Sequence, residues 1–271
     1  MDVCFGPIWP GYLRPMARSQ TVRAFVEEVG DIASFTGRFF REVFRPRYEW
    51  AELLRQSFIN GYRSLPLVAV TAFIMGLVLT VQSRPTLERF GAESMLPLMV
   101  AISVVREIGP VITALICAGK IGSSIGAELG SMKVTEQIDA MEVSGTNPFK
   151  YLVVTRVVST TLMLPVLVVF ADAIAIYASY IGVNIKGSVS WSLFHQQVFD
   201  SLVFADFLPA FIKSFFFGFA IGIVGCYKGF NTKNGTEGVG QASHSSVVVA
   251  SLVIFVIDLI AVQITDILGY N

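Results

Sequence analysis

Charged residues are scarce in this chain of 271 residues, since only 15% of them are Asp, Glu, Lys or Arg. Soluble domains usually contain about 25% charged residues. Hydrophobic residues make up 54% of the chain, and the mean hydropathy is +0.65. This excess of hydrophobic residues indicates a protein that is partly surrounded by membrane lipid. The formal net charge is zero, so nothing in the totals suggests nucleic-acid binding.

The sequence also lacks the common motifs of catalysis and metal binding. Its three cysteines (Cys4, Cys117 and Cys226) are scattered, and they form no CxxC pair or Cys/His cluster. This spacing argues against a zinc site, a thiol redox motif or a disulfide framework. There is no HExxH and no GxSxG, and His195 and His244 fall in separate predicted loops. We therefore predict no metal site and no catalytic group.

A nucleotide site is not expected either. The Gly119-Lys120 pair lacks the rest of a P-loop, because Ala114 stands where the first glycine is needed and Ile121 replaces the Ser or Thr. We therefore expect that this chain binds no cofactor and does not hydrolyse ATP itself.

Five long apolar runs are present, at about 65–82, 95–118, 157–183, 209–227 and 246–268. Each approaches the roughly 20 residues that a helix needs to cross the hydrocarbon core. The runs are too long for transmembrane strands and do not alternate. The predicted fold is an all-α integral membrane protein, with about five transmembrane helices in a domain over 65–271.

Residues 1–64 are predicted to form an N-terminal interfacial region. Between 21 and 45, apolar residues recur at three- and four-residue steps, and Pro46 follows this pattern. The pattern fits a helix packed on a soluble domain or a helix lying on the membrane. The second is favoured, because the chain offers no other soluble domain. Another amphipathic segment, about 48–64, leads into the first span.

The distribution of basic residues predicts the orientation. With the N-terminus in the cytoplasm, loops 119–156 and 228–245 are cytoplasmic, and they carry basic residues such as Lys120, Lys133, Lys150 and Lys228. The opposite loops contain only Arg84, Arg89 and Lys186. We predict an inside N-terminus and an outside C-terminus.

Arg106 and Glu107 lie in the middle of the second run. Each costs about 2.5–3.5 kcal/mol at a helix centre, whereas the Leu, Ile and Val residues between Leu96 and Ile116 return roughly 3–7 kcal/mol. The insertion free energy of this span alone is therefore close to zero, and the two charges need partners from other helices or contact with water. The pair either lines a polar part of a substrate cavity or forms structural ion pairs, and its possible partners are Asp172, Lys213 and Asp258.

Three features surround this pair. Pro110 can kink the helix and free a carbonyl group. Gly122, Gly126 and Gly130 recur every fourth residue and predict close helix packing. The segment 134–145 predicts a short amphipathic helix, with Thr135 as cap, Glu136 in the first turn and Gly145 as stop. Its apolar side carries Val134, Ile138 and Met141, and its acidic side carries Glu136, Asp139 and Glu142. It is either a docking element for a partner or an ordinary solvated loop helix.

The stretch LMVAISVVREIGPVITALICAGKIGSSIGAELGSMKVTEQIDAMEVSGTNPFKYLVVTRVVS resembles the MlaE-type permeases of lipid-transporting ABC systems. The resemblance is carried by RE-GP, AG, GS, AE-G-M, TEQIDAMEV and NP, and weaker similarity extends from about residue 48 to the C-terminus. It implies a homodimeric permease in a bacterial inner membrane or a plastid envelope. It also implies a separate cytoplasmic ATPase, an MCE-domain protein on the far side, a small STAS-domain protein in many systems, and a phospholipid or similar substrate.

By this resemblance the segment 134–145 is the coupling helix for the ATPase. The expected coupling residues are Glu128, Thr135, Glu136, Ile138, Asp139, Met141 and Glu142. Arg106, Glu107, Gln82 and Pro110 are expected near the lipid pocket, although the sequence QSRPTLERFGAE after Gln82 departs from the familiar pattern. Two other functions stay open, namely an autonomous ion- or proton-coupled carrier or channel, and a membrane enzyme of lipid metabolism. The carrier should show inverted repeats, which the sequence does not reveal.

Overall fold

The computed structural model describes residues 18–45, 49–185, 187, 189–200, 202, 204–233 and 235–267. Within these ranges all regular elements are helices, as an all-α membrane protein requires. Their bounds are α1 Arg18–Val43, α2 Trp50–Tyr62, α3 Leu65–Arg89, η1 Glu93–Met95, α4 Leu96–Ser103, η2 Val104–Ile108, α5 Gly109–Cys117, η3 Ala118–Gly122, α6 Ser123–Val134, α7 Gln137–Val143, η4 Phe149–Val154, α8 Thr155–Asn184, α9 Trp191–Phe199, α10 Phe204–Phe230 and α11 Gly235–Ile267.

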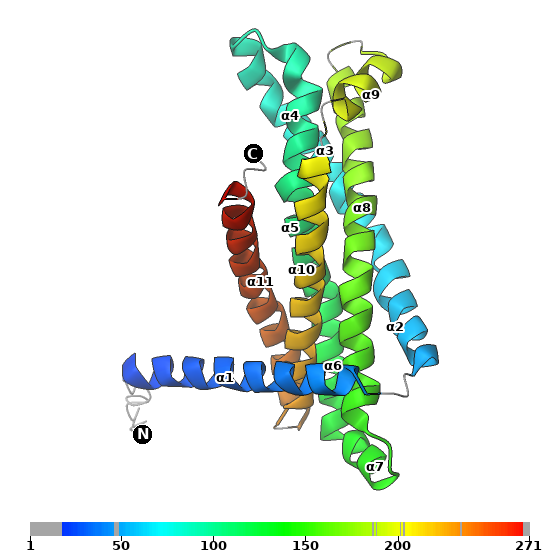
Figure 1. The fold of residues 1–271 in the computed structure, drawn as a ribbon, viewed down its shortest axis with the longest axis vertical. Helices are drawn as coiled ribbons and strands as arrows, with labels where there is room; N and C mark the ends of the chain where they lie inside the picture. The colour runs from blue at the N-terminus through cyan, green and yellow to red at the C-terminus, as the bar shows by residue number, and fades with distance from the viewer. Residues whose placement is uncertain are drawn as a thin grey trace, which may run out of the picture.

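Five segments of the described chain are long and apolar enough to cross a membrane, which confirms the predicted number. They run over Trp50–Arg89, Glu93–Val134, Phe149–Asn184, Asp206–Phe230 and Gly235–Ile267. They stand roughly side by side, with α7 at one end of the bundle and α9 at the other (Figure 1). We call these the α7 end and the α9 end. The predicted inside loops lie at the α7 end.

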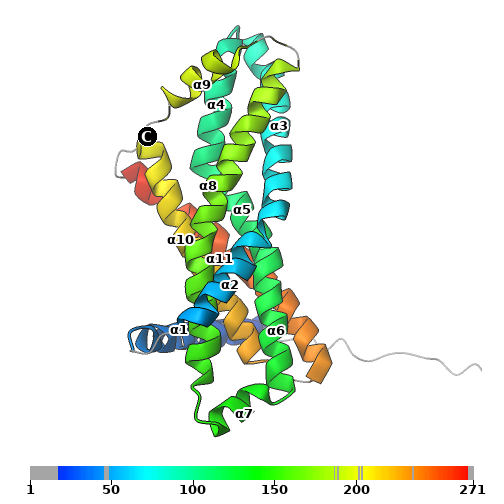
Figure 2. The same ribbon diagram turned by 90° about the vertical axis from the view of Figure 1, so that its right-hand side faces the viewer.

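The first helix, α1, covers the segment that the sequence predicts to be an interfacial helix. It runs almost at right angles to the spans and crosses them near the α7 end (Figures 1 and 2). Phe39 is buried against the bundle, whereas Val26, Val29 and Phe44 are exposed. A helix that lies across a bundle and still exposes apolar side chains fits the boundary of a membrane.

The second predicted interfacial segment behaves differently, because α2 continues into α3 as the lower part of the first span. Its polar residues face inward: Glu52, Gln56 and Asn60 are buried, and the Asn60 amide donates to the Ser159 hydroxyl at 3.1 Å. Its apolar residues Trp50, Leu54, Phe58 and Tyr62 are exposed. This inverted pattern is stable where lipid, rather than water, surrounds the helix.

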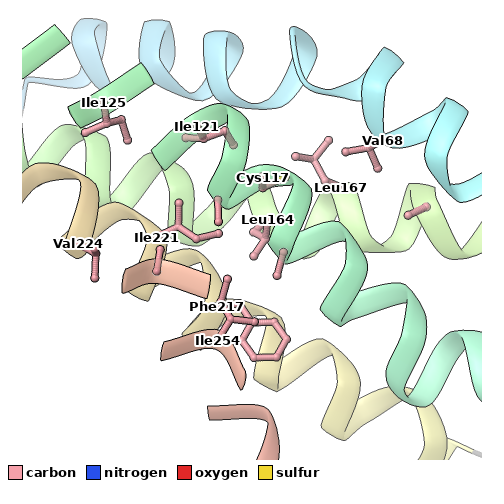
Figure 3. Packing of buried hydrophobic residues seen from close by; sticks show 14 of the residues in the cluster. Val68, Cys117, Ile121, Ile125, Leu164, Leu167, Phe217, Ile221, Val224 and Ile254 are labelled. Atoms are coloured by element: carbon pink, nitrogen blue, oxygen red, sulfur yellow. The ribbon is translucent and has the colours of Figure 1, made fainter. Parts of the chain in front are cut away.

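The core lies between α5, α6, α8, α10 and α11, where side chains such as Cys117, Leu164, Phe217, Ile221 and Ile254 interdigitate (Figure 3). Helix α8 is central, since it packs against α2, α3, α5 and α10. Small residues allow close approach. A Cβ atom on Gly218 would lie 2.6 Å from the carbonyl oxygen of Thr160 in α8.

The second span is longer than the predicted run 95–118. It is one nearly continuous rod of α4, η2, α5, η3 and α6 that ends at Val134, beside α7. Two short π-helical segments, η2 and η3, interrupt its α-helical hydrogen bonding. The apolar run ends where Gly119 and Lys120 begin, but helical hydrogen bonding does not depend on hydropathy. The rod therefore continues beyond the stretch that hydropathy identifies.

Candidate functional site

Arg106 and Glu107 lie in η2, a π-helical turn at Val104–Ile108. The cause is local. Buried Pro110 has no N–H to donate to the carbonyl of Arg106, and the Gly109 N–H bonds instead to the carbonyl of Val104, five residues back. Pro110 therefore shapes the backbone that presents both charged side chains, which are only partly buried.

Glu107 pairs with a lysine from another span. The Lys213 Nζ lies 2.7 Å from the Glu107 Oε2 and 3.0 Å from the Asp258 Oδ1. The Lys213 side chain is only 4% exposed, whereas that of Glu107 is 46% exposed. One buried ammonium group thus joins η2, α10 and α11. Lys213 and Asp258 are two of the three partners that the sequence suggests.

Arg106 pairs with a residue that sequence reasoning missed. Its guanidinium donates to the carboxylate of Asp206, whose side chain is 4% exposed, while the Arg106 side chain is 36% exposed. Asp206 precedes the predicted run 209–227 and was therefore assigned to a loop, whereas α10 begins at Phe204. The position of Asp206, a charged residue just before an apolar run, was the available sign that the helix could begin earlier.

Asp172 is the third suggested partner, and it joins neither charge by a hydrogen bond. It is buried in α8, and its Oδ1 has no hydrogen-bond partner within the described part of the chain. This oxygen lies instead against the backbone of Gly109, where a Cβ atom would collide with it. Asp172 therefore packs against the backbone of the π-turn, and its Oδ1 forms no hydrogen bond there.

A cavity of about 500 Å³ opens beside the charged cluster, between α10 and α11. Its walls are almost entirely apolar, from residues such as Ile212, Phe216, Ile257 and Ile260, and Lys213 also lines it. The volume is in the range of small-molecule sites. An apolar cavity with an ion-paired lysine in its wall can take an amphipathic molecule.

Gln82 is not brought to this cluster by any described contact. It is exposed on α3, a helix that packs mainly against α8. Among the described residues, no group of three or more His, Cys, Asp or Glu side chains is placed to hold a metal ion.

The short helix α7, Gln137–Val143, lies within the predicted range 134–145. Its predicted stop is present: Gly145 has φ +79°, its N–H donates to the Glu142 carbonyl, and the Thr146 N–H donates to the Met141 carbonyl. These two bonds form a Schellman motif, in which glycine is preferred.

The predicted start is wrong. Thr135 ends α6, and its hydroxyl donates to the carbonyl of Ser131 at 2.8 Å. Glu136, expected in the first turn, is the N-cap with φ +57° and makes no side-chain capping bond. The chain turns so tightly between α6 and α7 that the hydroxyl bonds back to the preceding helix.

The surface of α7 also differs from the sequence pattern. Ile138 is only 1% exposed and anchors the helix to the bundle, and Met141 is partly buried. Val143 is 90% exposed, together with the acidic Asp139 and Glu142. Sequence reasoning missed Val143, because it does not belong to the apolar side of Ile138 and Met141, which packs against the protein. Val143 is thus an exposed apolar side chain of α7 at this end of the bundle.

Glu128 lies on α6 above α7. Its carboxylate pairs at 2.9 Å with the guanidinium of Arg156, a residue of α8 whose side chain is 2% exposed. Glu128 therefore fixes α6 to α8, although half of its own side chain remains exposed.

The glycines of the predicted stripe lie where α6 and η3 meet α10, α11 and the loop between them. A Cβ atom on Gly126 would lie 2.6 Å from the Ser246 Oγ, and one on Gly130 would lie 2.9 Å from the Thr232 Oγ1. Gly122 is less tight, at 3.6 Å from the Ile221 Cγ2. Side chains at Gly126 and Gly130 would push α6 away from α11 and from the loop that follows α10.

Comparisons with known proteins agree with this architecture. The family model described as "Permease MlaE" matches residues 53–264. A probable ABC transporter permease protein of Rickettsia typhi is 37% identical over 232 residues, which cover 86% of this chain and 90% of the relative. The intermembrane phospholipid transport system permease protein MlaE of Haemophilus influenzae is 36% identical over 216 residues, or 78% and 82% of the two chains.

A probable ABC transporter permease protein of Synechocystis is 33% identical over 227 residues, which cover 83% of this chain and 86% of the relative. The family match spans all five membrane segments, including η2, the charged cluster and α7. The chain therefore belongs to the MlaE permease family and is a multi-pass permease of the ABC transporter class.

Proposed function

We propose that this permease moves phospholipid, or a related lipid with apolar chains and a charged headgroup, and that a separate ATPase supplies the energy. The observation that carries the proposal is the apolar cavity between α10 and α11 with Lys213 in its wall. The cavity can hold acyl chains, while the charges of the cluster meet the headgroup. The printed name of the Haemophilus relative, a phospholipid transport permease, supports the same substrate class.

Some of the charged side chains near the cavity remain partly exposed, so a substrate can reach them. Lys213 is buried between two carboxylates, whereas Arg106 and Glu107 are each exposed over a third to a half of their side chains. A lipid phosphate can accept hydrogen bonds from the exposed part of the Arg106 guanidinium, which has five N–H donors. The cluster therefore combines ion pairs with charged side chains that a headgroup can reach.

We further propose a homodimer. Helix α11 exposes a long apolar face that includes Leu252, Phe255, Val256, Leu259 and Ile264. This face adjoins the cavity, so a second copy packed near it would enclose the space between two α10–α11 pairs. Enclosure by a second copy would separate a bound lipid from the surrounding bilayer.

The ATPase is proposed to bind at α7. Val143 and the acidic Asp139 and Glu142 form its exposed surface, while buried Ile138 ties it to the bundle. The rod from Leu96 to Val134 connects α7 with η2, which carries Arg106 and Glu107. Movement imposed on α7 can therefore reach the charged cluster along one helix, with the π-turns η2 and η3 as points of bending.

The remaining partners and the orientation stay proposals. ATP is used by the partner ATPase, the α7 end faces the cytoplasm, and the bilayer is a bacterial inner membrane. An MCE-domain protein at the α9 end and a STAS-domain protein at the α7 end are proposed from the family resemblance. The position of α1, α7 and most basic loops at one end supports this orientation.

The cavity is tested by filling it. Ala261→Trp places a large ring between α10 and α11, whereas Val70→Trp adds the same ring to the exposed face of α3. In proteoliposomes with the ATPase, transfer of a fluorescent phospholipid should fall strongly for Ala261→Trp and stay near the wild-type rate for Val70→Trp. Normal transfer by a folded Ala261→Trp protein would refute the assignment of the cavity.

The coupling surface is tested by a charge. Val143→Asp adds a carboxylate to the exposed surface of α7, and Phe90→Asp makes the same change at an 80% exposed residue at the α9 end. Only Val143→Asp should weaken binding of the ATPase and lipid-stimulated ATP hydrolysis, because the partner contacts α7. Equal effects of both changes would contradict docking at α7. Lipid transfer without any ATPase would favour an autonomous carrier instead.

A further inference from the structure

A second cavity lies at the α7 end, far along the bundle from the α10–α11 cavity. It has a volume of about 700 Å³ and is formed by α1, the end of α10 and the start of α11. Its lining is mainly polar and includes Asp31, Arg38, Lys228, Lys233, Gln241 and Ser245. We call this cavity the α1 groove. We propose that the α1 groove binds the phosphodiester headgroup of a phospholipid from the adjacent leaflet, as a site separate from the transport cavity.

Aromatic contacts support one wall of the α1 groove. Phe35 lines it and packs edge-on against Phe149 at 5.0 Å and against Tyr227 at 5.7 Å between ring centroids. The Arg38 guanidinium lies 4.3 Å from the centroid of the Phe149 ring. Such stacking holds a guanidinium in place and leaves its N–H groups for an anion. Arg38 is thus positioned before any ligand arrives.

The charges of the α1 groove suit a phosphodiester. Arg38, Lys228 and Lys233 come from three different segments, and they oppose Asp31 and Glu28, the latter ion-paired to Lys228. Three positive and two negative charges leave a formal excess of one positive charge, which matches one phosphodiester. The remaining carboxylate, Asp31, can accept a hydrogen bond from a hydroxyl or ammonium group of the headgroup.

The position of the α1 groove favours a lipid over a soluble anion. Helix α1 crosses the bundle at a right angle and exposes Val26, Val29 and Phe44, as a helix at the membrane boundary does. The first turns of α11 are polar, and its apolar run begins only after Ser246. The groove therefore lies at the level where apolar surface gives way to polar surface, which is where headgroups are found.

The test is a titration of the purified full-length protein with phosphatidylglycerol, followed by native mass spectrometry. It uses the Ala261→Trp background, so that lipid in the transport cavity does not contribute. The double variant Arg38→Gln/Lys233→Gln removes two groove cations. The matched control, Arg41→Gln/Arg55→Gln, makes the same charge change at exposed residues that do not line the groove. A single Lys233→Gln variant guards against misfolding of the double variant.

We expect the groove variant to weaken lipid binding about tenfold or more, because two charge-assisted hydrogen bonds are lost. The single variant should show an intermediate loss, and the control should stay within about twofold of the wild type. Equal losses in groove variant and control would show diffuse attraction and would overturn the proposal. Equally strong binding of glycerol 3-phosphate would identify a soluble phosphate as the ligand and overturn the lipid assignment. A failure of transport by the wild-type protein would leave this result unaffected, since the readout is binding alone.

Discussion

Lys213 offers the sharpest test of the charged cluster, because its role can be compared with an ion pair of nearly equal length elsewhere. Lys213→Met leaves the carboxylates of Glu107 and Asp258 without their shared partner. Removing one member of a buried pair costs about 3–5 kcal/mol. The two carboxylates keep 46% and 20% of their side-chain exposure, so solvent reduces the expected loss to about 2–3 kcal/mol.

The control is Lys133→Met. Lys133 pairs with Asp139 at 2.8 Å, almost the distance of the Lys213–Glu107 pair, but its side chains are 34% and 52% exposed. An exposed pair contributes about 0–1 kcal/mol. The distance is therefore nearly matched, and the two sites differ in burial and in the second carboxylate that pairs with Lys213.

The measurement is reversible unfolding in mixed micelles, followed by circular dichroism as the denaturing detergent increases. A loss of about 2–3 kcal/mol raises the unfolding constant about 30- to 150-fold. The triple variant Lys213→Met/Glu107→Gln/Asp258→Asn should recover part of the stability, since no unpaired charge remains. A Lys213→Met protein as stable as the Lys133→Met protein would refute the reasoning.

Three further changes test packing and turns. Gly126→Ala should cost about 1–3 kcal/mol, because its Cβ would lie 2.6 Å from the Ser246 Oγ, whereas Gly119→Ala meets no atom within 4 Å and should not destabilise; thermal unfolding measures both. Ile138→Ala should cost about 2–5 kcal/mol, because Ile138 is buried, and should make α7 more sensitive to proteolysis. Gly145→Ala should cost about 1–2 kcal/mol, because φ is +79°, and unchanged stability in denaturant would contradict this.

The sequence by itself determined the architecture and the end of one helix, α7. Hydropathy is a local property of about twenty residues, so the number of spans could be predicted from the apolar runs. The amphipathic pattern of α1 and the stop of α7 at Gly145 are also local, and both are present. The predicted cap at Thr135 was wrong, because its hydroxyl donates to the Ser131 carbonyl of the preceding helix, and a local pattern does not distinguish between two neighbouring helices.

Only the tertiary structure decided which charges meet and which side of each helix faces inward. Glu107, Lys213 and Asp258 lie on three spans, and their pairing depends on the rotation and depth of each helix rather than on any single segment. The same is true of the buried polar face of α2 and of Val143, whose exposure follows from the way Ile138 docks. In lipid, an apolar side chain can face either way at little cost, so its pattern does not identify the inner face. The few polar contacts and glycine-lined approaches between helices determine it instead.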